Sequence, residues 1–308
     1  MLADPLVTPR ARTQVLGLTL LAVLAALLAG CTAPYSSQGR AGYPTANYAA
    51  APAHPTAAEQ AATLLATQGY RRILNTASQA LTAHLAAVAR DAGAQDLAHA
   101  KLDELAAQAS YDVLRGDIAA DSATAMQLDG ESWGTSTGVA NGLHAIEQAL
   151  WTSPNLVAAR RLAVGLETQS LLAGFIFFRA IITPAQMLSQ AQSQLSWAVD
   201  TAVTGREELF SHLDLVDVAA TAAATQHTFE LVVPLGRIVA PGETALTAAR
   251  FAALTREIRS LGASTSRPDA SIGTATWRTI AAALDAVDAP LGSLSGDVTG
   301  FGTGRLYA

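Results

Sequence analysis

A helical period runs through almost the whole chain from residue 57 onward, and it limits the folds that the chain can adopt. Within residues 57–92 the apolar side chains recur at spacings near three, four and seven, which is the period of an amphipathic helix. Half of the chain is hydrophobic and only 6% is aromatic, so alanine and leucine, both strong helix formers, supply most of the apolar content. The sequence has no alternating strand pattern and no internal repeat of fixed period. We therefore expect an all-α fold.

Glycines, prolines and polar stretches divide this periodic region into eight predicted helices. They span residues 57–92, 95–114, 139–153, 155–182, 184–203, 214–231, 243–261 and 274–287. Thr183 and Pro184 are of the types preferred at an N-cap and at the first helical position. Pro234 is expected to end one helix, and the tail after Pro290 is expected to be irregular. The predicted architecture is a helical bundle of two packed four-helix units.

The predicted helix over residues 155–182 contains the apolar run LLAGFIFFRAII, which resembles part of a membrane span. Charged residues bracket this run too closely for a comfortable span: Arg160, Arg161, Glu167 and Arg179. We therefore expect a central buried helix of the bundle.

Residues 1–30 are typical of a bacterial lipoprotein signal peptide. Arg10 and Arg12 form a positive segment, and an apolar stretch of signal-peptide length follows over residues 15–29. That stretch leads into Leu-Ala-Gly-Cys, where Cys31 is the only cysteine of the chain. The pattern resembles a lipobox, in which the thiol of the cysteine is lipidated and the chain is cleaved just before it. The alternative is an ordinary signal peptide that ends near a cysteine by chance.

The segment between the predicted lipid and the helices reads as a flexible tether. Residues 31–56 are rich in Pro, Ala, Ser, Gly and Tyr and have no apolar period. Residues 57–308 are expected to form one all-helical domain. This organisation predicts a protein of the cell envelope, anchored by lipid on Cys31 to the outer face of the cytoplasmic membrane, or periplasmic.

The charge of the chain argues against nucleic acid as a partner. The formal net charge is -6, and the sequence contains no basic run. An acidic balance is compatible with cation binding but does not identify a site.

The pair His144-x-x-Glu147, within GLHAIEQALW, is the first candidate for a cation site. Residues three apart are neighbours on a helix, so the imidazole and the carboxylate can face one cation. On a helical wheel both lie beside an apolar stripe of Leu143, Ile146 and Leu150. Helical bundles build metal sites from the reversed motif, Glu-x-x-His. From spacing alone, a solvated or mutually hydrogen-bonded pair stays the more common alternative.

Further ligands would have to come from other parts of the chain. The acidic and histidine candidates in three short segments are Asp112, Asp129, Glu131, Glu207, Glu208, His212 and Asp214. Each of these alone also has a structural explanation, as a turn residue, a helix cap or a charge that suits a helix dipole. His84, His99 and His227 stand alone on predicted helices and are expected to be surface or core residues.

Three segments of the chain carry a family resemblance: GLHAIEQALW, ITPAQML over residues 182–188, and residues 204–235. Together they resemble the imelysin-like family, the domain of the EfeO and EfeM iron-uptake lipoproteins. GLHAIEQALW is similar to the family signature G-F-H-x-I-E-x-A-L-W, and ITPAQML, over residues 182–188, is similar to its I-T-P-A segment. Residues 204–235 resemble its S-G-E-E-x-x-Y-S-H-T-D-L-W-D region. The three segments follow the family's order, and the resemblance covers the chain from about residue 60 to 288.

The resemblance implies an all-helical double bundle with a cation site between its halves. Carried over to this chain, the site would consist of His144 and Glu147 with Asp112, Asp129 and Glu207. The cation would be iron, with zinc or copper as alternatives. The implied role is delivery of iron to an EfeU-type permease, with an EfeB-type peroxidase as a further partner. No cupredoxin-like region precedes the helices, so the short, EfeM-like form is the one expected.

One departure from the family pattern leaves other functions open. The family often has Y-E-x-x-E where this chain has Tyr111-Asp112-Val113-Leu114-Arg115, which replaces the second glutamate by a guanidinium that cannot ligate metal. The site is then weaker, shifted or suited to an anionic chelate, or the chain is a structural lipoprotein with a degenerate site. A metallopeptidase is a third alternative, but the zincin motif H-E-x-x-H is absent from the sequence.

Overall fold

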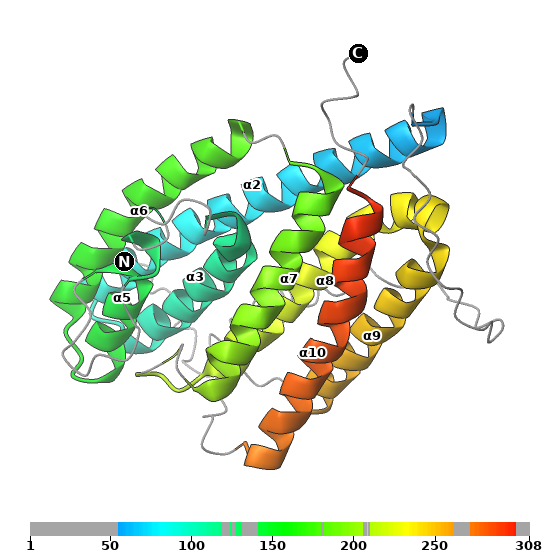
Figure 1. Ribbon diagram of the computed structural model, residues 1–308. Coiled ribbons are helices and arrows are strands. Elements are labelled where there is room, and N and C mark those ends of the chain that lie inside the picture. Colours follow the sequence, from blue (N-terminus) through cyan, green and yellow to red (C-terminus); the bar gives the residue numbers. More distant parts are fainter. Residues whose placement is uncertain are drawn as a thin grey trace, which may run out of the picture. The chain divides into compact units, whose positions relative to one another are not determined.

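The computed structural model describes residues 55–118, 124, 127–130, 141–179, 182–205, 208, 210–261 and 272–299. These residues form eight α-helices and one short 3-10 helix, and the described part of the chain contains no strand (Figure 1). The elements are α2 (Ala57–Gly93), α3 (Leu97–Ile118), α5 (Gly142–Trp151), α6 (Leu156–Arg179), α7 (Pro184–Asp200), η1 (Ala202–Thr204), α8 (Asp214–Val239), α9 (Pro241–Ser260) and α10 (Thr274–Asp297). The predicted all-α class is confirmed.

The predicted signal peptide, the tether and the lipidation residue Cys31 lie outside the described residues, except for the last two residues of the tether. Among the described helices, none is long and apolar enough to cross a membrane.

The helices contact one another in two groups. In the first group α2 packs against α3 and α6, and α5 packs against α3 and α6. In the second group α10 packs against α7 and α9, and α8 packs against the same two helices. Contacts of α8 with α2 and α3 join the groups, so α3 and α8 share an interface.

Two helices begin with reciprocal side-chain caps. The Thr56 hydroxyl accepts from the backbone N–H of Glu59, and the Glu59 carboxylate accepts from the backbone N–H of Thr56 at 2.6 Å. Thr183 and Gln186 make the same pair of bonds at the start of α7, where Pro184 occupies the first turn. These bonds satisfy backbone donors that have no partner within the helix. The predicted start of this helix at Thr183-Pro184 is confirmed.

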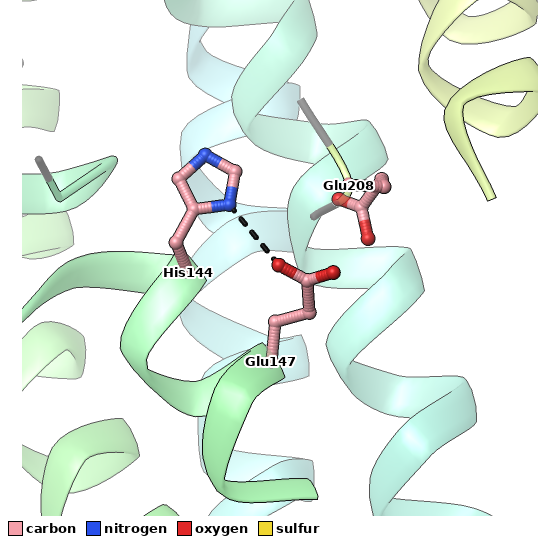
Figure 2. A group of neighbouring side chains, drawn as sticks. All are labelled: His144, Glu147 and Glu208. Atoms are coloured by element: carbon pink, nitrogen blue, oxygen red, sulfur yellow. Dashed lines mark hydrogen bonds and ion pairs between the residues drawn. The ribbon is translucent and has the colours of Figure 1, made fainter. Parts of the chain in front are cut away.

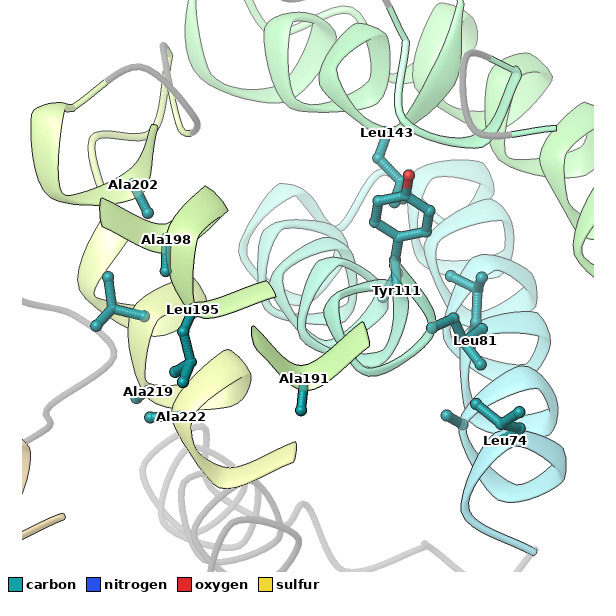
Figure 3. Packing of buried hydrophobic residues seen from close by; sticks show 14 of the residues in the cluster. Leu74, Leu81, Tyr111, Leu143, Ala191, Leu195, Ala198, Ala202, Ala219 and Ala222 are labelled. Carbon is teal, nitrogen blue, oxygen red and sulfur yellow. The ribbon is translucent and has the colours of Figure 1, made fainter. Parts of the chain in front are cut away.

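The core mixes large side chains with rows of alanines, and Figure 3 shows part of it. Leu74 and Leu81 of α2 are fully buried, as is Tyr111 of α3. On the other side, α7 and α8 present rows of alanines, including Ala191 and Ala219. Small side chains let helix axes approach closely, so the alanine-rich composition is used for tight packing as well as for helix propensity.

Pro234 was expected to end a helix, and the tail after Pro290 was expected to be irregular. Both prolines lie inside helices, so these two predictions are wrong. α8 continues through Pro234 to Val239, and α10 continues through Pro290 to Asp297. An interior proline removes one hydrogen bond and costs about 3 kcal/mol. Val232 and Leu235 beside Pro234 are fully buried, as is Leu291 beside Pro290. Burial of each such side chain contributes about 1.5–3 kcal/mol, which offsets the lost hydrogen bond.

The predicted central position of the helix at 155–182 is also wrong for the part whose side chains are described. α6 buries one stripe, which consists of Ala159, Ala163, Leu166 and Ser170. Its opposite face is open, because Val157, Val164 and Leu171 are 76%, 51% and 52% exposed. α6 is therefore an outer helix that packs mainly on α2 and α5.

Candidate metal centre

The short helix α5 is fixed at its start by a close contact between backbones. Gly142 has φ +80°, and a Cβ at this position would overlap the backbone of Asp129 and Gly130. The backbone N–H of His144 donates to the carbonyl of Asp129 at 3.2 Å. Only glycine combines a positive φ with such an approach at no steric cost, so Gly142 determines where α5 begins relative to the Asp129 turn.

His144 and Glu147 lie on the buried side of α5, as the helical wheel predicts. Their side chains are 1% and 0% exposed, and His144 Nδ1 is 3.3 Å from Glu147 Oε2 (Figure 2). The apolar stripe that was predicted beside them, Leu143, Ile146 and Leu150, is buried as well. The alternative from spacing alone was a solvated or mutually hydrogen-bonded pair. The pair is not solvated, but its two side chains lie within hydrogen-bond distance of each other.

Glu147 is held by two backbone donors from the segment before α8. Its Oε1 accepts from the N–H of Phe210 at 2.9 Å and from the N–H of Ser211 at 2.7 Å. These bonds orient the carboxylate and join α5 to a segment about 60 residues later in the sequence. The other oxygen, Oε2, faces His144.

Glu208 completes a group of three potential ligands. It is fully buried, its Oε2 accepts from the Ser211 hydroxyl, and its Oε1 has no hydrogen-bond partner among the described residues. One ligand atom each of His144, Glu147 and Glu208 lie within 4.8 Å of one another (Figure 2). Two ligands of one zinc ion lie at most about 4.2 Å apart, so a small side-chain movement would let the three share an ion.

A third carboxylate, Glu104 of α3, is part of the same buried region. It is 1% exposed, and neither of its oxygens has a hydrogen-bond partner among the described residues. Burial raises the pKa of Glu104 well above its usual value, the charge of Glu147 raises it further, and His144 acts in the opposite direction. Since buried polar groups in proteins are normally hydrogen-bonded, an orphaned carboxylate here points to a missing partner.

The electrostatics of the region favour a cation. Burial is the main cause that raises the pKa of Glu208 well above its usual value, and the charges of Glu147 and Glu104 add to this effect. His144 and the Ser211 hydroxyl lower it. Three carboxylates excluded from water repel one another when ionised. A cation among them would remove that repulsion, and carboxylate and imidazole are ligands that suit iron, zinc and copper.

Asp112 and Asp129, two of the predicted ligands, are bound by Arg115 instead. Arg115 donates to Asp112 Oδ1 at 3.0 Å and to Asp129 Oδ2 at 3.0 Å. Its guanidinium also lies over the ring of Trp197, at 3.7 Å from the centroid. Asp129 Oδ1 is 3.6 Å from His144 Nε2, so Asp129 connects the arginine to the histidine. Neither aspartate belongs to the three-residue group.

Of the remaining ligand candidates from the sequence that the structure describes, only Glu208 belongs to the buried group. Glu207 and Glu131 lie outside the described residues. Glu208 was also a candidate from the sequence, and it belongs to the group with His144 and Glu147. His212 is exposed. Asp214 is buried, and its Oδ1 accepts from the backbone N–H of Glu208 at 3.1 Å. It is therefore a support of the Glu208 segment and not the side-chain cap of α8.

Sequence reasoning missed Glu104. A signal existed, because Glu104, Gln108, Asp112 and Arg115 recur at spacings of four, four and three, and all four are buried. Polar residues at this spacing in a helix that is otherwise rich in alanine and leucine indicate a polar stripe within the bundle. α3 also packs against α8, where Asp214 and Asp217 are buried too.

The described fold and group of ligands define an all-α protein with a buried histidine–carboxylate cluster. No protein-family model matches the chain, and no curated protein is significantly similar to it. The resemblance to the imelysin-like family stays a prediction from the three sequence segments.

Proposed function

We propose that the chain is an imelysin-like lipoprotein of the cell envelope that binds iron and delivers it to an EfeU-type permease, with an EfeB-type peroxidase as a further partner. The observation that carries the proposal is the buried convergence of His144, Glu147 and Glu208. The buried carboxylate of Glu104 supports it, because a cation would supply the partner that both oxygens lack among the described residues. Zinc and copper suit the same ligands and are the alternative cargo.

In this proposal Glu147 and Glu208 bind the cation through carboxylate oxygens, and His144 binds it through Nδ1. Nε2 of His144 would then point to Asp129, which is the kind of outer partner that orients a metal-binding histidine. Arg115 keeps Asp129 in place and has its own charge balanced by Asp112 and Asp129. Because two aspartates balance the charge of Arg115, its presence is weaker evidence that the chain has lost its metal site.

A metallopeptidase is the less favoured function for a site made of the same residues. Glu147 Oε1 accepts two backbone hydrogen bonds, and Oε2 faces His144. A carboxylate held in this way is suited to bind a cation, whereas a general base needs a free approach to a water molecule.

The test is calorimetric titration of the full chain, stripped with a chelator, with ferrous iron under anaerobic conditions, zinc or copper. We expect one strong site per chain, weakened at least about 100-fold by His144→Ala and by Glu147→Ala. The matched control is His227→Ala, because His227 and Glu230 form a second H-x-x-E pair on α8 whose side chains are 39% and 32% exposed. Equal weak binding by all four proteins would leave the structural lipoprotein as the better reading.

Delivery is tested separately, by following radioactive iron from the loaded chain into vesicles that contain an EfeU-type permease. Uptake that depends on the loaded chain would support the transport role. Binding without any transfer would limit the proposal to a cation-binding protein.

A further inference from the structure

The outward face of α6 carries an apolar stripe that the fold leaves uncovered. Val157, Val164 and Leu171 are three of the six large apolar side chains that are exposed in the described part of the chain. They recur every seven residues, so they lie almost in line along about 21 Å of helix. Single exposed apolar residues are ordinary, but a row with heptad spacing is typical of helix–helix contacts.

The surroundings of the stripe leave room for a second helix. Gly165, next to Val164, has no heavy atom within 4 Å of the position that a Cβ would occupy. α6 makes its contacts on the opposite side, with α2 and α5 (Figure 1). A second helix can therefore approach the middle of the stripe closely, beside Gly165.

The polar residues beside the stripe make α6 complementary to itself. On one flank lie Arg160 and Glu167, and on the other lie Arg161 and Thr168. In an antiparallel pair of α6 helices related by a two-fold axis at Val164, each flank meets the same flank of the other copy. In the single chain the Arg160 side chain lies against Gly93 at the end of α2. On association it turns toward Glu167 of the other copy, which gives two opposite-charge pairs.

The apolar positions match under the same symmetry. Val164 contacts Val164 of the second copy, and Val157 contacts Leu171. Each apolar residue of the stripe therefore has an apolar partner on the other copy. A parallel pair would instead place Arg160 beside Arg161 of the second copy and bring like charges together. The antiparallel arrangement is therefore favoured by charge.

We propose that two copies of the chain associate through their α6 helices, antiparallel and symmetric about Val164. The contact is isologous, so it closes at two copies. A single pair of helices forms a smaller interface than a standard protein complex, so we expect a reversible dimer with a dissociation constant of about 1–100 µM. α6 contributes none of the three grouped ligands, so this inference is independent of the proposed function.

The first experiment is sedimentation velocity of the full chain over a wide concentration series. We expect reversible dimerisation, weakened more than about 100-fold by Val164→Glu, which would place two carboxylates against each other at the two-fold axis. The matched control is Leu65→Glu, since Leu65 is 59% exposed on α2, outside the stripe. A dimer that Val164→Glu weakens no more than Leu65→Glu does would overturn the proposal, as would a chain that stays monomeric throughout.

A charge exchange tests the register. Arg160→Glu and Glu167→Arg each turn two attractive pairs into repulsive ones, so each alone should weaken the dimer about tenfold, and the double variant should restore it. A chain that carries Val164→Cys and Cys31→Ser should form a disulfide between two copies under oxidation. Single charge variants without effect, or a double variant no better than either, would refute the antiparallel pairing.

Discussion

Replacement of Glu104 by methionine should have opposite effects on the stability of the metal-free chain and on cation binding. Glu104 is 1% exposed, and both of its oxygens lack a hydrogen-bond partner within the described residues. An unsatisfied buried polar group costs about 1–3 kcal/mol, and methionine is an unbranched apolar residue of similar length with good helix propensity. We therefore expect Glu104→Met to raise the free energy of unfolding of the metal-free chain by about 1–3 kcal/mol at neutral pH.

The same substitution removes a carboxylate from the candidate metal centre. We expect the affinity for a bound cation to fall by about 10–100-fold, as is usual when an outer partner of a metal site is lost. A ligand that binds only the folded state stabilises it in proportion to the logarithm of its concentration over the dissociation constant. At equal cation concentration, the cation should therefore stabilise the variant less than the wild type by about 1.4–2.7 kcal/mol, if both are saturated.

The assay is urea denaturation followed by circular dichroism, once with excess chelator and once with the cation. The control is Glu257→Met on α9, where the glutamate belongs to another helix and is not among the grouped ligands. A Glu104→Met chain that is less stable than the wild type in chelator would refute the reasoning, because the carboxylate would then have a stabilising partner. A variant that gains as much from the cation as the wild type would show that Glu104 does not belong to the site.

Three further predictions concern residues around the centre and in the interface between helices. The pKa of Asp117 is raised to about 6, chiefly by burial, so its contribution to stability is present at low pH and is lost as the pH rises through 6. Asp117→Asn should therefore raise the free energy of unfolding by up to about 3 kcal/mol at pH 8 and by almost nothing at pH 3, as urea titrations at both values would measure. Gly142→Ala should lower the stability by more than about 1 kcal/mol and weaken cation binding, because α5 would move away from Asp129; thermal unfolding and calorimetry test both effects. Arg115→Met should destabilise the chain by about 3–5 kcal/mol, since two carboxylates would lose their buried partner, whereas an unchanged melting temperature would mean that solvent reaches them.

The fold was largely predictable because local signals and tertiary packing agree. The period of the apolar residues identified all eight described helices, and Thr183 with Pro184 identified the start of one to the residue. The failures occur where packing overrides a local rule. Pro234 and Pro290 both lie inside helices, because the side chains around them are buried well enough to offset the missing hydrogen bond.

The site was predictable only in part, because its residues come from three segments that tertiary packing brings together. His144 and Glu147 were found because they share one helix face. Glu208 lies between helices, where no period constrains the direction of a side chain, and its neighbour Glu207 was the residue chosen. Glu104 is 40 residues before His144, and only the packing of α3 against α5 and α8 gives it a role near the pair.

The two H-x-x-E pairs of the chain show why spacing alone cannot identify a site. His144–Glu147 and His227–Glu230 have the same spacing, and both pairs approach within 4 Å, at 3.3 and 3.6 Å. They differ in their surroundings: water reaches the second pair, whereas the first is buried and joined by Glu208. Buried ligands already lack their hydration shell and are held in place by the fold, so less free energy is lost when they bind a cation. The decisive information is thus the identity of the residues that surround a motif, and for this chain most of them lie far from it in the sequence.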